Sequence, residues 1–357
     1  MTSLALFSVY RRSTNRPSQA TAMVTHGLRI TRQICKVRNI DIAPPFLSDK
    51  NAADLNRRKI NDELLHLRHE ASKRPGIAPH EVDLAGYLSA SAIARQPIEE
   101  KSLPFLRDAN HSVTETRKLL HYGSDNTFKK NCTEAEMYDV SNRIKFSREL
   151  SKRHGNGNSF AAAAAIFMSA GNCGEHRDVA AAVHSRKLGE ADCIHLVSDK
   201  KEDHSWAEVE LHNGDRIVMD AWAYGPAVMA RDSEFGCDKD GRAVDLSLLG
   251  SRNEGAGFYK YVKKFLKDLK NGEEIKKWNE FSEAHLKRNP NKNFAINLLR
   301  SPHSVLGKKI KDKVMSSRND FIEEITAIGA ARALGANIKQ ARSISKKVTT
   351  SMDKIIR

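Results

Sequence analysis

Three side chains of the kinds that together activate a sulfur nucleophile lie within 50 residues of one another: Cys173, His204 and Asp220. A thiolate attacks carbonyl carbon atoms, an imidazole takes the thiol proton and later returns it, and a carboxylate orients the imidazole and stabilises its cation. The residue types therefore indicate thiol-dependent chemistry at a carbonyl. Cys173 would be the nucleophile, His204 the base and acid, and Asp220 the orienting group.

The sequence around Cys173 predicts that this residue opens a helix. Gly171-Asn172 ends an alanine-rich helix, and apolar residues then recur at helical spacing up to Leu188-Gly189. A cysteine in a first helical turn faces unpaired backbone N–H groups and the positive end of the helix dipole, and both favour the thiolate. The same N–H groups could stabilise an oxyanion on the attacked carbonyl. A single cysteine is more often an inert buried thiol, but the position and the downstream partners favour the nucleophile.

Two or three strands are predicted after this helix, at 193–198, 205–211 and 216–220. Asn213-Gly214 marks a hairpin between the last two strands. For the apolar residues of both strands to share a face, Val209 must oppose Ile217. That register requires a three-residue loop over 212–214, in which Gly214 takes a left-handed conformation.

This register places His204 and Asp220 on one face of the sheet. Asp220 then opposes Trp206 and is a diagonal neighbour of His204, which puts the two backbones about 7–8 Å apart. The carboxylate can therefore reach the imidazole. Trp206 shares that face and would wall the site or offer its indole N–H. Glu208 is also on that face and is expected to be a structural hydrogen-bonding or ion-pair group.

A zinc site is an alternative use of these residues. Cys173 and His176 have a C-x-x-H spacing, and Cys193, His195 and Cys237 could supply further ligands. Structural zinc sites usually have two close-spaced ligand pairs, and only Cys173 and His176 form a pair with a typical spacing. We therefore expect no metal and no cofactor. Ordinary roles are expected for Glu175, His176 and Asp178 at the helix start and for His184 and His195 in the core or on the surface.

The composition is that of a globular protein with reduced thiols. The chain has 357 residues, no apolar run long enough to span a membrane, and five cysteines without framework spacing. The positive charge lies at the ends: residues 1–40 have seven basic and no acidic residues, 251–357 have 24 and 11, and 41–250 have 28 and 33. A nucleic-acid-binding protein usually carries a basic patch on a recognisable module. No nucleic-acid partner is therefore expected, and the basic ends are interpreted as solvated tails.

Helices are predicted on both sides of this region. Residues 1–50 form a basic leader without a secretory signal, although an Arg-rich, Ser-rich, acid-free start is also typical of organelle transit peptides. Ser159 is the expected N-cap of the alanine-rich helix. The predicted helices span 52–74, 80–95, 112–122, 133–153 and 160–168. A Lys-rich surface helix follows residue 250, with an apolar face formed by Phe258, Tyr261, Val262, Phe265 and Leu269.

At these residues the chain resembles the transglutaminase-like superfamily of papain-type folds. The matching features are Gly171-x-Cys173 at a helix start, the strand His204-x-Trp206-x-Glu208-Val209, and a following strand that ends in Asp220. Within this superfamily, the Gly-Asn-Cys-Gly-Glu-His run, the Asp-Ala-Trp sequence and the length resemble the HopX/AvrPphE/XopE effectors. Plant-pathogenic bacteria deliver these effectors into host cells by type III secretion. The superfamily match covers about residues 155–235, and the effector match extends upstream through 110–150.

The resemblance implies a catalytic triad and a set of supporting residues. The triad is Cys173, His204 and Asp220, and the supporting or substrate-pocket residues are Asn172, Gly174, Trp206, Glu208 and Trp222. It also implies a host protein as substrate, a secretion chaperone on the N-terminal segment, and delivery to the host cytoplasm, nucleus or membrane surface. The chain begins Met1-Thr2 rather than Met-Gly, so no myristoyl anchor is expected.

The expected fold is α+β, with a papain/transglutaminase-like core in which the Cys173 helix packs on a small antiparallel sheet. The expected parts are a disordered basic leader at 1–50, a helical region at 51–154, a catalytic core at 155–250 and a Lys-rich helical region at 251–357. The expected activity is acyl transfer through a thioester, as a cysteine protease or, alternatively, as a glutamine deamidase or transglutaminase. The alternative from another class is a catalytically inactive module that binds a host protein.

Overall fold

The computed structural model describes residues 76–127, 133–155, 157–236, 241–250, 254–288 and 303–357. The leader at 1–50, the helix expected at 52–74 and the cysteines Cys35, Cys132 and Cys237 lie outside these residues. The described chain is α+β: it is mostly helical and contains one small antiparallel sheet. No helix in the described part is long and apolar enough to cross a membrane.

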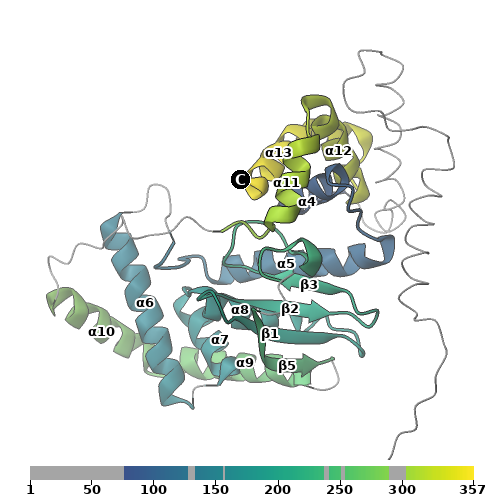
Figure 1. Cartoon of the computed structure of the whole chain (residues 1–357). Helices are drawn as coiled ribbons and strands as arrows, with labels where there is room; N and C mark the ends of the chain where they lie inside the picture. The colour runs from purple at the N-terminus through teal and green to yellow at the C-terminus, as the bar shows by residue number, and fades with distance from the viewer. Residues whose placement is uncertain (1–75, 128–132, 156, 237–240, 251–253, 289–302) are drawn as a thin grey trace, which may run out of the picture. The chain divides into compact units, whose positions relative to one another are not determined.

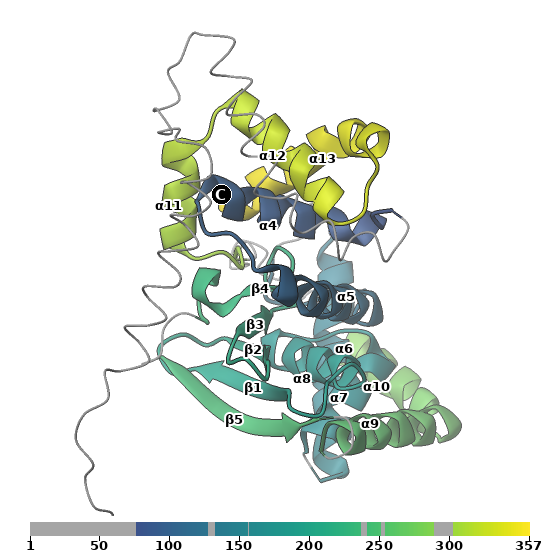
Figure 2. The same ribbon diagram turned by 90° about the vertical axis from the view of Figure 1, so that its right-hand side faces the viewer.

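The sheet has five strands in the order β4-β3-β2-β1-β5, and every neighbouring pair is antiparallel (Figures 1 and 2). The strands are β1 (Cys193–Asp199), β2 (Ser205–Glu210), β3 (Arg216–Met219), β4 (Val228–Met229) and β5 (Arg242–Leu249). The first three lie within one residue of the predicted bounds. Strands β4 and β5 were not predicted. β5 is a largely exposed edge strand, so it has no strong alternation of apolar and polar residues.

The β2–β3 hairpin has the register that the apolar pattern predicts. Val209 pairs with Ile217. The Leu211 N–H donates to the Asp215 carbonyl at 2.8 Å, which leaves a three-residue loop over 212–214. Gly214 has a φ of 82°, the left-handed conformation expected for it. Both the loop length and the register are therefore confirmed.

Helix α8 (Cys173–His184) packs on β1 and β2 and carries Cys173 as its first residue. Helix α5 (Leu103–Leu119) packs on α8 and β3, and α7 (Asn158–Met168) packs on α8 from another side. In Figure 2 these helices lie on one side of the sheet. Ala162 to Ala165 are fully buried, since small side chains let neighbouring helices approach α7 closely.

Three helix ends differ from the predictions. Helix α7 begins at Asn158 with Gly157 as its N-cap, so Ser159 lies inside the helix and the predicted cap was wrong. Helix α5 begins nine residues before the predicted 112, at a first turn that contains Pro104, a residue suited to that position. Helix α8 ends at His184, before the predicted Leu188-Gly189.

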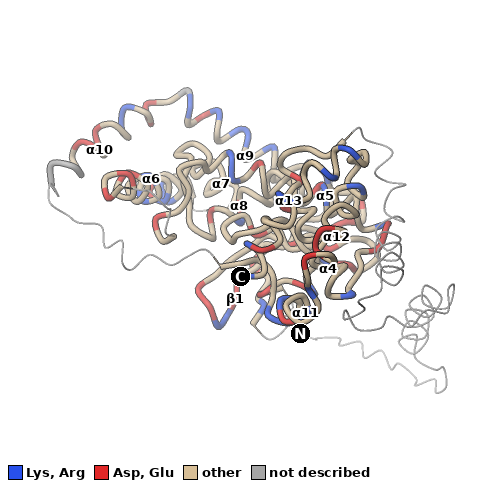
Figure 3. Tube along the Cα trace, turned by 90° about the horizontal axis from the view of Figure 1, so that it is seen from above, with Lys and Arg blue, Asp and Glu red and all other residues tan. Residues whose placement is uncertain are grey.

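Two further helices cover α7. These are α6 (Glu134–Arg153) and α9 (Glu254–Asn271), and α10 (Glu274–Arg288) packs on α6. Phe258, Val262 and Leu269 of α9 are buried, whereas the lysines of this helix are exposed. Figure 3 marks the positions of these lysines as blue segments along α9. The prediction of an amphipathic surface helix is confirmed. Tyr261 is the exception on its apolar face, with 58% of its surface exposed.

A second group of helices joins the two ends of the described chain. Helix α4 (Val82–Ile93) packs on α11 (Lys308–Ser317), α12 (Asp320–Ala333) and α13 (Ile338–Ile356). Tyr87 of α4 donates to Asp232 Oδ2 at 2.6 Å and accepts from the Met229 N–H at 3.2 Å. One hydrophobic cluster contains buried residues from each of the ranges 51–154, 155–250 and 251–357. These three ranges therefore share a core.

We predict opposite effects for alanine at two glycines whose added Cβ would meet no neighbouring atom, Gly214 and Gly257. Gly214→Ala should lower the free energy of unfolding by about 1 kcal/mol, because alanine is strained at a positive φ. Gly257→Ala, within α9, should raise it by about 0.5–1 kcal/mol through helix propensity. Urea unfolding of both variants checks this. A Gly214→Ala variant as stable as the wild type would contradict the loop conformation.

Candidate active site

Cys173 occupies the first position of α8, where the helix has N–H groups without helical partners. Asn172 precedes it in an extended conformation, and its N–H donates to Glu175 Oε2 at 2.8 Å. The Asn172 side-chain oxygen accepts from Ser124 Oγ at 2.7 Å. A Cβ on Gly174 would have no atom within 4 Å, so the space beside this residue is open. The start of α8 is thus fixed by neighbours while Cys173 stays partly exposed.

His204 and Asp220 are joined by a short hydrogen bond, with 2.6 Å between Nε2 and Oδ2. Both side chains are buried, at 5% and 2% exposure. The other carboxylate oxygen of Asp220 accepts from the backbone N–H groups of Trp222 at 3.1 Å and Ala223 at 2.9 Å. The structure therefore brings together the two residues that the hairpin register placed on one face.

The side chain of Cys173 lies near the His204 imidazole and contributes to the rise in the pKa of this ring. His204 Nε2 is engaged by Asp220, so Nδ1 is the ring nitrogen left for the thiol. The start of α8 and the start of β2 therefore lie near each other, which spacing in the sequence could not establish. Cys173 thus lies beside the hydrogen-bonded His204–Asp220 pair, and these three residues form the Cys173–His204–Asp220 chain of interacting groups.

The charges in this chain are set by its burial and by its own members. Burial alone would lower the pKa of His204, but the Asp220 carboxylate and the Cys173 side chain outweigh it and raise the pKa to about 10. Burial would raise the pKa of Asp220, but the His204 cation, the hydrogen bond from the Ala223 N–H and Arg117 keep it below its ordinary value. At neutral pH the pair is therefore an imidazolium and a carboxylate.

Arg117 of α5 holds the loop that follows Asp220. Its guanidinium donates to the carbonyl oxygens of Ala221 at 3.0 Å, Ala223 at 2.6 Å and Gly225 at 2.7 Å. A planar guanidinium offers five N–H donors in a fixed geometry, which suits several carbonyls at once. Sequence reasoning missed Arg117, because nothing in the last turn of a predicted helix marks an arginine that binds a loop 104 residues away.

Aromatic rings surround the His204 imidazole. The ring centroids of Phe235, Trp222 and Trp206 lie 4.6, 5.1 and 5.9 Å from that of His204. The Trp222 indole N–H donates to Ser124 Oγ and to Asn126 Oδ1, each at 3.2 Å. Phe235 also contacts His303. Sequence reasoning missed Phe235, Ser124 and Asn126, which come from loops whose positions no local pattern reveals.

Glu208 is a structural charge, the role expected for it. It is fully buried and pairs with Arg216 at 2.7 Å and Arg242 at 2.8 Å. The Trp206 indole N–H donates to Glu208 Oε2 at 3.3 Å. Because this N–H is engaged there, Trp206 contributes to the site as a wall rather than as a donor to substrate.

The other predicted polar residues lie in separate environments. His176 is buried one turn after Cys173, and its Nδ1 donates to the Asn172 carbonyl at 2.9 Å. Burial raises the pKa of Asp178 to about 6 and lowers that of His184 to about 4. His195 bonds Ser247 and Glu210 on the sheet. Among the described residues, no three His, Cys, Asp or Glu side chains group as metal ligands would.

Comparisons of the chain with protein-family models, with curated proteins and with solved structures returned no match.

We predict that the His204–Asp220 pair makes stability fall at alkaline pH. Below pH 6.5, the ordinary pKa of histidine, His204 is protonated in both the folded and the unfolded chain, so the pair contributes fully. Between pH 6.5 and about 10 only the folded state keeps this proton, and the contribution is lost. The free energy of unfolding of the wild type relative to Asp220→Asn should therefore decline by a few kcal/mol, as an order of magnitude, across this range.

Urea unfolding at several pH values between 5 and 10 tests this. The comparison with Asp220→Asn removes the contributions of other alkaline groups, because both proteins share them. Parallel curves for the two proteins would contradict the charge assignment. On the acid side, the lowered pKa of Asp220 means that the difference persists until pH falls below the ordinary value of 3.8.

Proposed function

We propose that this protein is a thiol-dependent enzyme that acts on a protein substrate through a thioester, as a cysteine protease. The observation that carries the proposal is the Cys173–His204–Asp220 chain, in which the thiol lies near an imidazole that a buried carboxylate holds through a hydrogen bond of 2.6 Å. Replacing a buried ion pair by well-packed hydrophobic residues often costs a protein no stability, so stability alone does not explain the presence of the His204–Asp220 pair. A protonated imidazole beside a cysteine at a helix start is the arrangement that favours a reactive thiolate.

The proposed reaction begins from a thiolate and an imidazolium. Cys173 Sγ attacks the substrate carbonyl carbon, forming a C–S bond as the carbonyl π electrons move to oxygen. The intermediate collapses to a thioester, and the C–N bond breaks as the leaving amine takes the proton of His204. Water then attacks the thioester, gives a proton to His204 and expels Cys173 as a thiolate. Asp220 keeps the imidazole oriented throughout.

The backbone N–H groups of Cys173 and Gly174 are the proposed oxyanion donors. They open α8, where helix geometry gives them no carbonyl partner and the helix dipole is positive. The open space beside Gly174 leaves room for the carbonyl oxygen to approach. In this role the donors act on charge that develops only in the transition state.

The finer fold and the biological setting belong to the same proposal. A nucleophile helix packed on an antiparallel sheet, with histidine and aspartate on adjacent strand ends, fits a papain/transglutaminase-like core. The resemblance to HopX/AvrPphE/XopE effectors supports a host protein as substrate. It also supports type III delivery into the host cell through the basic leader, which lies outside the described residues.

We predict that Cys173→Ala abolishes activity with little loss of stability, because Cys173 is partly exposed at a helix end. The matched control is Cys193→Ala, which removes the other cysteine in the described residues. Burial raises the pKa of the Cys193 thiol, so it is a poor nucleophile. Intact-mass analysis of candidate host proteins incubated with each variant should show modification by the wild type and by Cys193→Ala alone.

The kind of mass change identifies the reaction. Fragments indicate a protease, a gain of about 1 Da indicates deamidation, and a gained amine indicates transglutamination, since the same thioester serves all three. Activity that persists in Cys173→Ala would contradict the proposal. Binding to a host protein with no mass change would favour a catalytically inactive binding module.

A further inference from the structure

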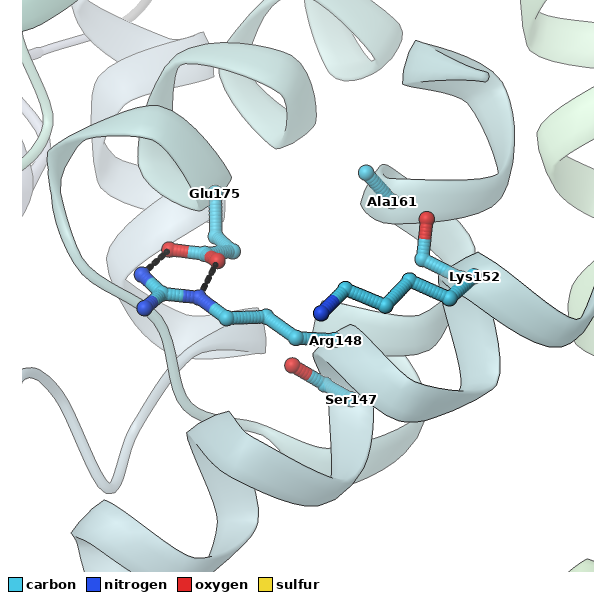
Figure 4. Close-up of a pocket in the computed structure, with 6 residues that line it drawn as sticks. Ser147, Arg148, Lys152, Ala161 and Glu175 are labelled. Carbon is cyan, nitrogen blue, oxygen red and sulfur yellow. Dashed lines mark hydrogen bonds and ion pairs between the residues drawn. The ribbon is translucent and has the colours of Figure 1, made fainter. Parts of the chain in front are cut away.

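A cavity of about 240 Å³ lies between α6, α7 and the first turn of α8. Figure 4 shows Arg148 and Glu175 joined across one side of it, while Lys152 extends toward Arg148 and Ser147. The lining residues are Ser147, Arg148, Ser151, Lys152, Ala161 and Glu175; all but Ala161 are polar or charged, and much of the surface that they present to the cavity is from their apolar atoms. None of them belongs to the Cys173–His204–Asp220 chain.

Two groups in this cavity have hydrogen-bonding or charge capacity that the described chain does not use. Ser151 is 5% exposed, yet its hydroxyl has no hydrogen-bond partner. Lys152 is exposed and pairs with no carboxylate among the described residues. A buried hydroxyl without a partner is uncommon in folded proteins and suggests a group that is not present.

The one carboxylate in the cavity is already neutralised. Arg148 Nε and one terminal nitrogen of its guanidinium meet Glu175 at 2.7 and 3.2 Å. Glu175 also accepts from the Asn172 N–H at 2.8 Å. With Arg148 and Glu175 balanced, Lys152 leaves the cavity with one net positive charge. This favours a ligand with one negative charge and oxygen acceptors for hydroxyl groups.

The cavity adjoins the proposed nucleophile. Glu175 lies two residues after Cys173 in the same helical turn. The hydrogen bond to Glu175 raises the pKa of Arg148 most, and Cys173 is among the other groups that raise it, so Cys173 lies near the cavity. A substrate bound at Cys173 could therefore place a nearby side chain in the cavity.

We propose that this cavity is a subsite for an acidic side chain, Glu or Asp, of the polypeptide substrate, with Lys152 and Ser151 as its ligands. The inference rests on the proposed function, because it takes Cys173 as the point of attack. A single carboxylate matches the single unpaired cation, whereas a phosphate dianion would need a second one. The enzyme would thus select sequences with an acidic residue near the attacked carbonyl.

Affinity labelling with alkylating peptides tests the subsite without knowledge of the host protein. The probes are bromoacetyl peptides with zero, one or two glycines before a Glu, Gln or phosphoserine amide. Cys173 Sγ displaces bromide as the C–S bond forms, and mass spectrometry of the digested protein measures the rate at this residue. For at least one spacer length, the Glu probe should react about fivefold faster than its Gln counterpart, the scale of one partly exposed ion pair.

Variants assign this preference to the cavity. Lys152→Gln should reduce the Glu-to-Gln ratio to about one, and Ser151→Ala should reduce it by about twofold without destabilising the fold, since its hydroxyl is unpaired. The matched control is Lys145→Gln, which removes an exposed lysine of the same helix outside the cavity and should keep the full ratio. Iodoacetamide, which is neutral and small, should react equally with all these proteins.

Three results would overturn the subsite: no preference at any spacer length, a preference that survives Lys152→Gln, or faster reaction of the phosphoserine probe than of the Glu probe. Failure of the proposed function looks different. In that case iodoacetamide would modify Cys173 no faster than Cys193, whatever the relative rates of the peptide probes. Fast iodoacetamide reaction without a Glu preference therefore contradicts the subsite alone.

Discussion

The buried hydrogen bond between His204 and Asp220 is the interaction on which the site depends. An imidazole at this depth would lose its proton without a partner, because burial disfavours its charged form. The Asp220 carboxylate reverses that tendency and holds the ring with its other nitrogen toward Cys173. The negative charge of Asp220 is thus the reason that His204 keeps its positive charge. Cys173, the partly exposed residue of the three, lies beside this pair.

Much of the surrounding fold keeps this contact in place. The β2–β3 register sets which residues meet, two backbone N–H groups fix the second oxygen of Asp220, and Arg117 holds the loop that supplies them. Aromatic rings around His204 exclude water and strengthen the interaction. Helix α8 brings its first turn to this point because its apolar face packs on β1 and β2. The precision of the site therefore comes from rigid elements rather than from the reacting groups themselves.

The sequence predicted the parts that local patterns control. Alternating apolar residues and Asn213-Gly214 specify the hairpin, so the Val209–Ile217 register and the His204–Asp220 contact could be expected before the structure. Contacts between distant segments could not. Ser351 of α13 donates a hydrogen bond to Asp83, which lies 268 residues away in the sequence. Arg117 binds the loop that follows β3, and Phe235 contacts His204 from an irregular segment. Neither periodicity nor turn chemistry carries information about such pairs, and the exposed edge strand β5 has too weak an apolar pattern to predict.

The most direct test of this account is an NMR titration of the His204 ring in the wild type and in Cys173→Ala. Coupling to both partners predicts that the wild-type ring titrates at about pH 10. It also predicts a lower pKa for His204 in Cys173→Ala, because the cysteine contributes to the rise. If His204 instead titrates near its ordinary value of 6.5 in both proteins, the imidazolium is not held by Asp220 and does not meet Cys173, and the account is wrong.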